Sequence, residues 1–100
     1  MEKRTPHYDL DAIKAVVAKA RLAAFTALAR QGARRMGLSE SETLAVVLGL
    51  KRGMLFKSMT THADHRVWQE VYHAPCPNGK TAYIKLTLQE GAVVIQFKEK

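Results

Sequence analysis

The sequence predicts an α+β fold in which amino-terminal helices pack on one face of an antiparallel β-sheet. Three observations support this prediction. Alanine and leucine recur at helical spacing through residues 10–50, whereas residues 54–100 hold four segments that alternate between apolar and polar side chains. The chain has 100 residues, just enough for one hydrophobic core, so we expect a single domain spanning residues 1–100. Helices followed by a run of strands are typical of α+β proteins.

The first helix is expected to begin near Leu10. Asp9 or Asp11 can cap it, because an aspartate side chain accepts a hydrogen bond from the free N–H groups of a helix start. Leu10, Ile13 and Val17 recur at helical spacing, so we expect them to form the buried stripe of this helix.

Alanine remains frequent over residues 12–33, which favours further helix. We expect the helix to continue or restart through Leu22, Phe25, Leu28 and Ala29, with room for a short extended break in residues 21–24. Gly37 is suited to end this region, because glycine readily adopts the left-handed conformation that follows many helices.

A further helix is predicted after Ser39. Glu42 follows three residues later, and this spacing forms a capping box in which each side chain bonds the other residue's backbone N–H. Residues 43–50 are apolar on nearly all sides, so we expect this helix to be buried against the sheet.

Residues 54–61 and 66–73 are expected to form the next two elements, both strands, with side chains that alternate between two sides. The sides of the first are Leu55, Lys57 and Met59 against Met54, Phe56 and Ser58. The sides of the second are Val67, Gln69, Val71 and His73 against Trp68, Glu70 and Tyr72.

The linker of residues 75–79 decides which side of the second strand faces the core. A two-residue turn at Asn78 and Gly79 would direct Gln69 into the core. A five-residue loop would direct Gln69 to the open face. Pro77 has no N–H and fits poorly in a strand ladder, so we favour the longer loop. That loop pairs Ala74 with Lys80, Val71 with Tyr83 and Gln69 with Lys85, and it sends Trp68 and Tyr72 to the core side.

The clearest pattern lies in residues 80–100, which read as two strands joined by a tight turn at Glu90 and Gly91. The resulting register sets Gln89 opposite Ala92, Leu88 opposite Val93, Leu86 opposite Ile95, Ile84 opposite Phe97 and Tyr83 opposite Lys98. A slip by one residue would expose one of the two apolar sets, which supports this register. The phenol of Tyr83 and the ammonium of Lys98 then stand side by side on the open face, with Cβ atoms about 5 Å apart.

Charge and cysteine content limit the partners and the compartment. Sixteen Lys and Arg against nine Asp and Glu give a formal net charge of +7, so RNA, DNA or an acidic protein surface are natural partners, and solubility alone is the alternative. The single cysteine, Cys76, excludes an intramolecular disulfide. The charged amino terminus is followed by no apolar run, and no stretch approaches the length of a membrane helix, so we expect a cytoplasmic protein.

The residues best suited to chemistry are Lys57, Gln69, Tyr83 and Lys98. Two lysines and a phenol suit a phosphodiester, because fixed cations stabilise the charge that builds on phosphoryl oxygens and a Tyr hydroxyl can pass a proton. The residues expected to contact substrate are Phe56, Met59, Lys85 and His65. The alternative is that the lysines of the sheet are simply solvated.

Histidine spacing gives little support for a metal site. His62 and His65 are three residues apart and His73 and Cys76 follow, but no second spaced pair completes a tetrahedron. We therefore expect no metal and no cofactor. His7 could act in catalysis only if the amino terminus folded over the sheet.

Other aromatic and basic residues have two possible roles each, one in binding and one in structure. Trp68 could stack on a base, although the favoured loop length sends it to the core, and Phe56 could be a base platform or a core residue. Arg30, Arg34 and Arg35 could contact phosphates or an acidic partner, or form a solvated helix face. The chain has no Ser/His/Asp arrangement, glycine-rich phosphate loop or CxxC pattern, which leaves dehydrogenase, kinase and thiol-redox functions without support.

Several segments resemble the MqsR family of bacterial toxins: the opening MEKRTPH, FKSMTT, DHRVWQEVYH and the ending FKEK. The resemblance covers the first seven residues and residues 56–100, and between them it is mainly one of helical pattern. It implies a fold similar to the RelE and YoeB toxins, cleavage of single-stranded mRNA, typically at GCU, and neutralisation by MqsA, a zinc-binding antitoxin with a helix-turn-helix domain.

The resemblance also implies roles for four residues. The Lys before SMTT is Lys57, the Gln after Trp68 is Gln69, the Tyr of the following strand is Tyr83, and the Lys of FKEK is Lys98. One position departs from the resemblance, because Phe56 stands where a member of the family has a tyrosine. A hydroxyl role is lost there, and stacking or packing remains.

Two hypotheses about function follow. The first is a metal-independent endoribonuclease in which the ribose 2′-OH attacks the adjacent phosphorus. The second is a non-catalytic binding module for single-stranded nucleic acid or an acidic partner on the same basic face.

Overall fold

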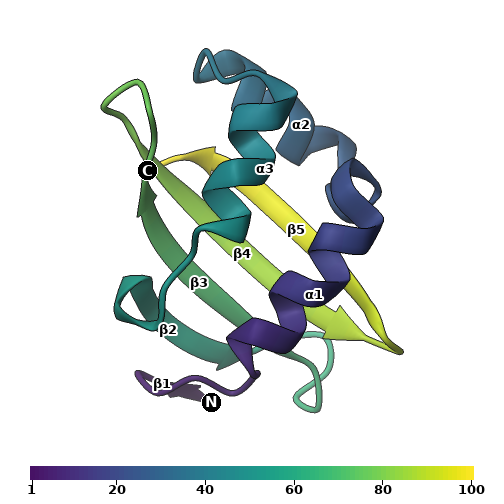
Figure 1. Ribbon diagram of the computed structural model, residues 1–100. Helices are drawn as coiled ribbons and strands as arrows, with labels where there is room; N and C mark the ends of the chain where they lie inside the picture. The colour runs from purple at the N-terminus through teal and green to yellow at the C-terminus, as the bar shows by residue number, and fades with distance from the viewer.

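The computed structural model describes residues 1–100 and has three α-helices packed on one face of a five-stranded antiparallel sheet (Figure 1). The strands lie side by side in chain order, from β1 to β5. The predicted α+β class is confirmed, and β1 is an edge strand that the sequence did not indicate. The elements are β1 (Glu2–Lys3), α1 (Leu10–Ala20), α2 (Ala27–Arg35), α3 (Glu40–Leu48), β2 (Leu55–Thr60), β3 (Trp68–Pro75), β4 (Thr81–Gln89) and β5 (Ala92–Glu99).

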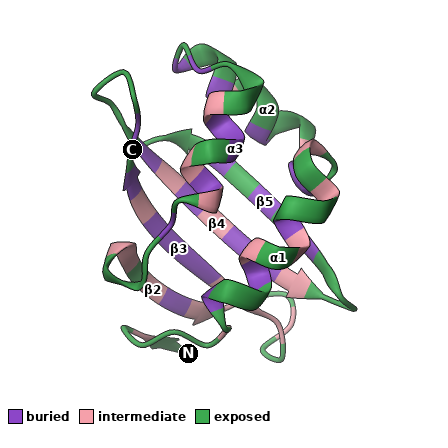
Figure 2. Ribbon diagram, in the orientation of Figure 1, coloured by how far each residue is buried: buried purple, intermediate pink, exposed green.

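The start of α1 is as predicted. The side chain of Asp9 accepts a hydrogen bond from the N–H of Asp11 at 3.0 Å and so caps the helix. The three residues of the predicted stripe are buried: Leu10, Ile13 and Val17. The opposite side of α1 is exposed, so the helix lies on the sheet with one face down (Figure 2).

The chain between α1 and α2 does not form the short extended break for which the sequence left room. Arg21 has a φ of 55°, which ends α1, and Arg21–Ala24 then forms a 3₁₀ helix. The N–H of Phe25 donates to the carbonyl of Leu22 at 3.0 Å, so the tight turn satisfies backbone groups that an extended segment would leave free.

Helix α2 lies along the outer edge of β5. The side chain of Thr26 caps α2 by accepting a hydrogen bond from the N–H of Ala29, and the N–H of Thr26 donates to the carbonyl of Ile95 at 3.1 Å. Gly32 faces the end of β5, where a Cβ would stand 2.2 Å from the backbone oxygen of Phe97. Glycine therefore permits an approach of helix and strand that a side chain would block.

The ends of α2 and α3 follow the predicted signals. Gly37 comes after α2 with a φ of 85°, the left-handed conformation expected of it. Ser39 and Glu42 form the capping box, with both hydrogen bonds present. Helix α3 ends at Gly49, and its buried residues face the sheet: Thr43, Leu44 and Val47.

Strand β2 contains a β-bulge that changes its predicted faces. Leu55 is paired with β3, the next paired residue is Lys57 opposite Val71, and Phe56 is the extra residue between them. The prediction that Leu55 and Lys57 share a side is wrong, because Leu55 packs against the core and Lys57 pairs on the other face. Phe56 is also on that other face, stacked on His73.

The loop between β3 and β4 has the predicted five residues but begins one residue later, at Cys76. Pro75 stays in the strand opposite Thr81, because the ladder bond there is made by the N–H of Cys76, which donates to Lys80 at 2.8 Å. The predicted pairs are therefore wrong by two positions on β4: Val71 lies opposite Lys85, Gln69 opposite Thr87 and Ala74 opposite Ala82. An even shift keeps the predicted faces, so Gln69 stays on the open face.

The hairpin of β4 and β5 has the predicted register in full, from Gln89 opposite Ala92 to Tyr83 opposite Lys98. Glu90 and Gly91 form its turn with φ values of 52° and 78°. Positive φ at both central residues is the requirement of a type I′ turn, whose twist matches that of the strands.

The amino-terminal segment is fastened to the helix side of the sheet by Glu70, which is fully buried. One carboxylate oxygen of Glu70 accepts hydrogen bonds from the N–H groups of His7 and Tyr8 and from the hydroxyl of Ser58. The ring of His7 stacks on Trp68 with centroids 4.5 Å apart. His7 thus lies on the face opposite the predicted site.

The core consists of 21 buried residues between the helices and the sheet (Figure 2). Its largest fully buried members include Tyr72, Ile13, Leu50, Ile84 and Leu86. Every buried side-chain polar atom has a hydrogen-bond partner. None of the helices has both the length and the apolar character that crossing a membrane requires.

Candidate active site

The sheet face opposite the helices, which we call the open face, carries three rows of side chains that cross neighbouring strands. Row one is Phe56, His73, Tyr83 and Lys98. Row two is Lys57, Val71, Lys85 and Gln96. Row three is Met59, Gln69, Thr87 and Val94.

Row one is a line of rings that ends in an ammonium group. The rings of Phe56 and His73 are stacked, 4.6 Å apart, and His73 lies 5.9 Å from the ring of Tyr83. The Nζ atom of Lys98 lies 5.1 Å from the centre of the Tyr83 ring. An imidazole, a phenol and a cation thus stand together, and these are groups that move protons and hold a phosphate.

Row two begins at Lys57, whose side chain is 24% exposed and forms a 3.0 Å ion pair with Glu2 of β1. The hydrogen bond and the positive charge of Lys57 lower the pKa of the Glu2 carboxyl. Further along the row, Val71 is fully buried although no helix covers it, and Lys85 is partly exposed beside it. Row two therefore presents two lysines, Lys57 and Lys85, on either side of the apolar Val71.

Row three contains the amide of Gln69, whose Nε2 atom donates a hydrogen bond to the hydroxyl of Thr87 at 3.2 Å. This contact fixes the orientation of the amide and leaves its oxygen free to accept. Met59 lies opposite Gln69 on the neighbouring strand. An amide with a partly exposed sulfur-bearing side chain beside it suits contacts with a nucleobase.

The structure places all four predicted catalytic residues on the open face but brings only Tyr83 and Lys98 into contact. Rows are about 7 Å apart and strands about 5 Å, so the Cα atoms of Gln69 and Tyr83 are separated by about 14 Å. The predicted register would have placed them about 8 Å apart. Lys57 lies about 12 Å from Tyr83 on the same estimate, and its long side chain shortens that gap.

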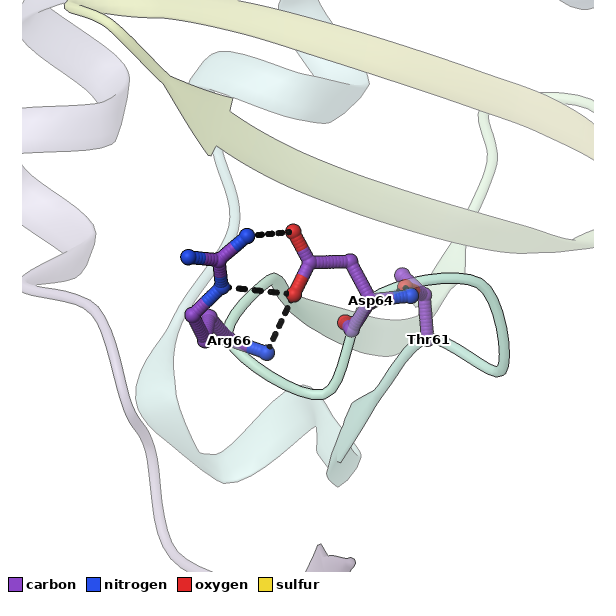
Figure 3. Close-up of polar contacts among 3 residues, drawn as sticks. All are labelled: Thr61, Asp64 and Arg66. Atoms are coloured by element: carbon purple, nitrogen blue, oxygen red, sulfur yellow. Dashed lines mark hydrogen bonds and ion pairs between the residues drawn. The ribbon is translucent and has the colours of Figure 1, made fainter.

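The four residues expected to contact substrate are distributed differently. Phe56, Met59 and Lys85 belong to the three rows of the open face. His65 is exposed in the loop between β2 and β3, beyond the end of the sheet where row three lies. Figure 3 shows how this loop is held: Arg66 forms a forked ion pair with Asp64, and the Thr61 hydroxyl bonds the Asp64 backbone.

Two residues of the site were not predicted. His73 was placed on the side of Gln69 and Val71 by strand alternation, so the signal was present, but no role was given to it. Burial, with a smaller effect of the Lys100 charge, lowers the pKa of His73. Arg4 lies 4.7 Å from the ring of Phe56 and donates to its backbone oxygen at 3.0 Å. No local pattern indicates Arg4, because it reaches the site through β1.

The remaining candidates lie elsewhere. Trp68 is on the helix side, as the favoured loop length predicted, covered by His7. The His, Cys, Asp and Glu side chains form no group of three that could hold a metal ion. Of the arginines on α2, Arg30 is paired with Glu40 at 3.0 Å.

Comparison with known proteins agrees with the resemblance seen in the sequence. The family model described as "Motility quorum-sensing regulator, toxin of MqsA" matches residues 5–99. The chain belongs to the MqsR toxin family. It is 37% identical over 100 residues to the mRNA interferase toxin MqsR of Escherichia coli (strain K12), and the match covers 100% of both chains. In this MqsR-family chain the open face carries all the candidate residues except His65, and the helices pack on the opposite face of the sheet.

Proposed function

We propose that this chain is the toxin of a toxin–antitoxin pair and cleaves single-stranded mRNA on its open face. The observation that carries the proposal is row one, where His73, Tyr83 and Lys98 stand in contact on a surface rich in cations. Its E. coli relative is named an mRNA interferase toxin, which supports mRNA as the substrate. We place the protein in the cytoplasm, where mRNA is translated, and regard the whole chain as one catalytic domain.

The reaction is an internal phosphoryl transfer. The ribose 2′-oxygen forms a bond to the adjacent phosphorus while the bond from phosphorus to the 5′-oxygen breaks, which leaves a 2′,3′-cyclic phosphate and a 5′-OH. The neutral imidazole of His73 accepts the proton of the 2′-OH, and the hydroxyl of Tyr83 gives a proton to the departing 5′-oxygen. Solvent then returns a proton to Tyr83 and takes one from His73.

Three lysines provide the positive charge that this reaction needs. Lys98 lies against Tyr83, where the phosphorane forms, and fixed cations there stabilise the charge on its oxygens. Lys57 and Lys85 in row two hold the neighbouring backbone phosphates. We infer that the reaction proceeds without a metal ion, because the three lysines supply positive charge of the kind that a metal ion would otherwise provide.

The other side chains select the RNA sequence. Phe56 is a stacking platform for a base, while the oriented amide of Gln69 and the adjacent Met59 contact a base two rows away. His65 in the β2–β3 loop contacts the strand beyond row three. We propose GCU as the recognised triplet, with successive nucleotides crossing successive rows.

We propose that an MqsA-like antitoxin, a zinc-binding protein with a helix-turn-helix domain, neutralises the toxin. The net charge of +7 suits an acidic surface on that partner. The family description, toxin of MqsA, supports this pairing.

The first experiment incubates purified protein with short RNAs that contain or lack GCU, in the presence of EDTA. Cleavage of the first RNA alone, with a 2′,3′-cyclic phosphate on the product, is expected. A 2′-deoxy substitution at the cleavage site should abolish the reaction and leave binding intact. Cleavage of that deoxy RNA would refute attack by the 2′-oxygen.

Variants test the assignment of residues. We expect Tyr83→Phe and Lys98→Met to reduce the rate of cleavage by about a hundredfold or more, since each removes a group that acts in the transition state. Lys19→Met, on the exposed side of α1, is the matched control and should cleave at the normal rate. Normal cleavage by both folded site variants would show that row one is not the catalytic centre.

A binding module without catalysis is the second candidate, and the separation of Gln69 and Lys57 from Tyr83 favours it. Residues spread over three rows suit a strand laid across the sheet as well as a reaction at one phosphate. This function predicts salt-sensitive RNA binding and no product from any RNA. The gel described above separates the two functions.

A further inference from the structure

A pocket of about 450 Å³ lies where α2 meets the edge of the open face. Its floor is formed by β4 and β5 and includes both members of the contact in row one, Tyr83 and Lys98. Its wall is α2, which the backbone bond from Thr26 to Ile95 and the close approach at Gly32 hold against β5. The proposed catalytic centre therefore opens directly into a walled groove.

The wall presents one stripe of α2. Leu28, Gln31 and Arg35 line the pocket, and their spacing of three and four residues places them on one face of the helix. Leu28 is 77% exposed, although large apolar side chains of this chain are mostly buried. Arg35 takes part in none of the ion pairs of the structure. Both side chains are thus available to a ligand.

The charge of the groove has one sign. Arg35 on the wall and Lys85 and Lys98 on the floor are cationic, and no acidic residue is among the eleven that line it. Gln31 and Gln96 add amides, which present both hydrogen-bond donors and acceptors. Cations beside an apolar side chain and two amides match the phosphate, the ring and the edge of a nucleotide.

We propose that this groove is a nucleotide subsite: it holds the RNA residue next to the cleaved phosphate, with Arg35 on that residue's own phosphate and Leu28 against its base. The inference rests on the proposed function, because the RNA must cross row one to reach the groove. The volume suits one nucleotide, which agrees with a single-stranded substrate. The groove thus makes α2 a determinant of which base is accepted beside the cut.

The test uses Arg35→Ala and Leu28→Ala, with Arg34→Ala as the matched control. Arg34 is the adjacent residue of the same helix but lines a different hollow, with Arg30 and Glu40. Binding is measured by fluorescence anisotropy on single-stranded RNA with a 2′-deoxy cleavage site, and cleavage on the all-ribose RNA. All three side chains are exposed, so unfolding is not a concern, and thermal melts verify it.

We expect Arg35→Ala to raise KM and Kd about five- to tenfold with little change in kcat. The slope of the logarithm of the binding constant against the logarithm of the salt concentration should become shallower by about 0.7, the value for one lost phosphate contact on a single strand. Leu28→Ala should relax the base preference at one position beside the cut. Arg34→Ala should match the wild type in each measurement.

Unchanged KM, salt slope and base preference in both groove variants, with an active wild type, would overturn the subsite. So would an Arg35→Ala variant that loses only its affinity for the antitoxin, because the groove would then be a protein interface. A wild type that neither cleaves nor binds RNA would instead reject the proposed function itself.

Discussion

The contact between Gly32 and β5 yields a prediction that can be worked out from the structure. A Cβ at position 32 would stand 2.2 Å from the oxygen of Phe97. Ordinary van der Waals contacts begin at 3.4 Å, so Gly32→Ala requires α2 and β5 to separate by roughly 1 Å. The oxygen belongs to the backbone of a paired strand and cannot rotate aside. The strain therefore falls on the packing of α2.

Two opposing effects set the size of the change. Alanine favours a helix interior over glycine by about 1 kcal/mol, which would stabilise the variant. Overpacking that moves a backbone costs typically about 1–3 kcal/mol, and here it also loosens the buried Ala29 and Ala33 of α2. We expect the clash to win and the free energy of unfolding to fall by about 2 kcal/mol.

The assay is urea unfolding followed by far-UV circular dichroism, together with a thermal melt. For a chain of this size, a loss of about 2 kcal/mol corresponds to a Tm lower by roughly 10 °C. Gly53→Ala is the matched control, because a Cβ there meets nothing within 4 Å, and its stability should change by less than about 0.5 kcal/mol. A Gly32→Ala protein more stable than the wild type by about 1 kcal/mol would refute the steric argument, since helix propensity alone would then decide.

Two further predictions concern ionisable groups. Glu70→Ala should lower the free energy of unfolding by about 3–5 kcal/mol and expose the amino-terminal segment to proteases, because buried N–H and O–H donors lose their acceptor. Glu40 is exposed, so the control Glu40→Ala should cost less than about 1 kcal/mol. Equal losses in the two variants would contradict this account. Burial lowers the pKa of His73, so its contribution to stability is complete above the ordinary pKa of about 6.5 and is lost as pH falls through the lower pKa of the folded state. His73 faces Tyr83, and the charge of Lys100 adds to the lowering of its pKa. The difference in urea midpoint between wild type and His73→Gln should therefore shrink as pH falls below about 6.5, and a constant difference would reject the assignment.

Local patterns predicted most of the fold because each acts over a few residues. Asp9 and the pair of Ser39 and Glu42 mark helix starts by hydrogen bonds within one turn, and the structure has both. The hairpin register followed from a two-residue turn and from apolar sets that a slip would expose. The 3₁₀ helix Arg21–Ala24 was not predicted; it leads into Phe25, which bridges to Ile95 of β5, a contact between residues distant in sequence. The likeness to the RelE and YoeB folds stays a prediction.

The candidate site shows which features local sequence patterns do not determine. Alternation determines the face on which a side chain lies, and it placed Gln69, Tyr83 and Lys98 correctly on the open face. The row depends on where a loop begins, and a loop displaced by one residue moved Gln69 two positions along β4. The bulge at Phe56 is a similar case, because one extra residue moved this ring to the open face, beside His73.

That displacement changes how the site must work. In the predicted register Gln69 would reach the phosphate held by Tyr83 and Lys98, and four side chains would surround one reacting centre. In the structure Gln69 is about 14 Å away, a distance that an amide cannot bridge within one nucleotide. The proposed mechanism assigns the proton-transfer position beside Tyr83 to His73, which faces it directly across the strand pair. In that mechanism, chemistry in row one and base selection in row three are separate tasks. A Gln69→Ala variant should alter which RNA is cleaved more than how fast the best RNA is cleaved, measured as kcat on matched substrates, whereas a loss of kcat on every RNA would place Gln69 back at the reacting phosphate.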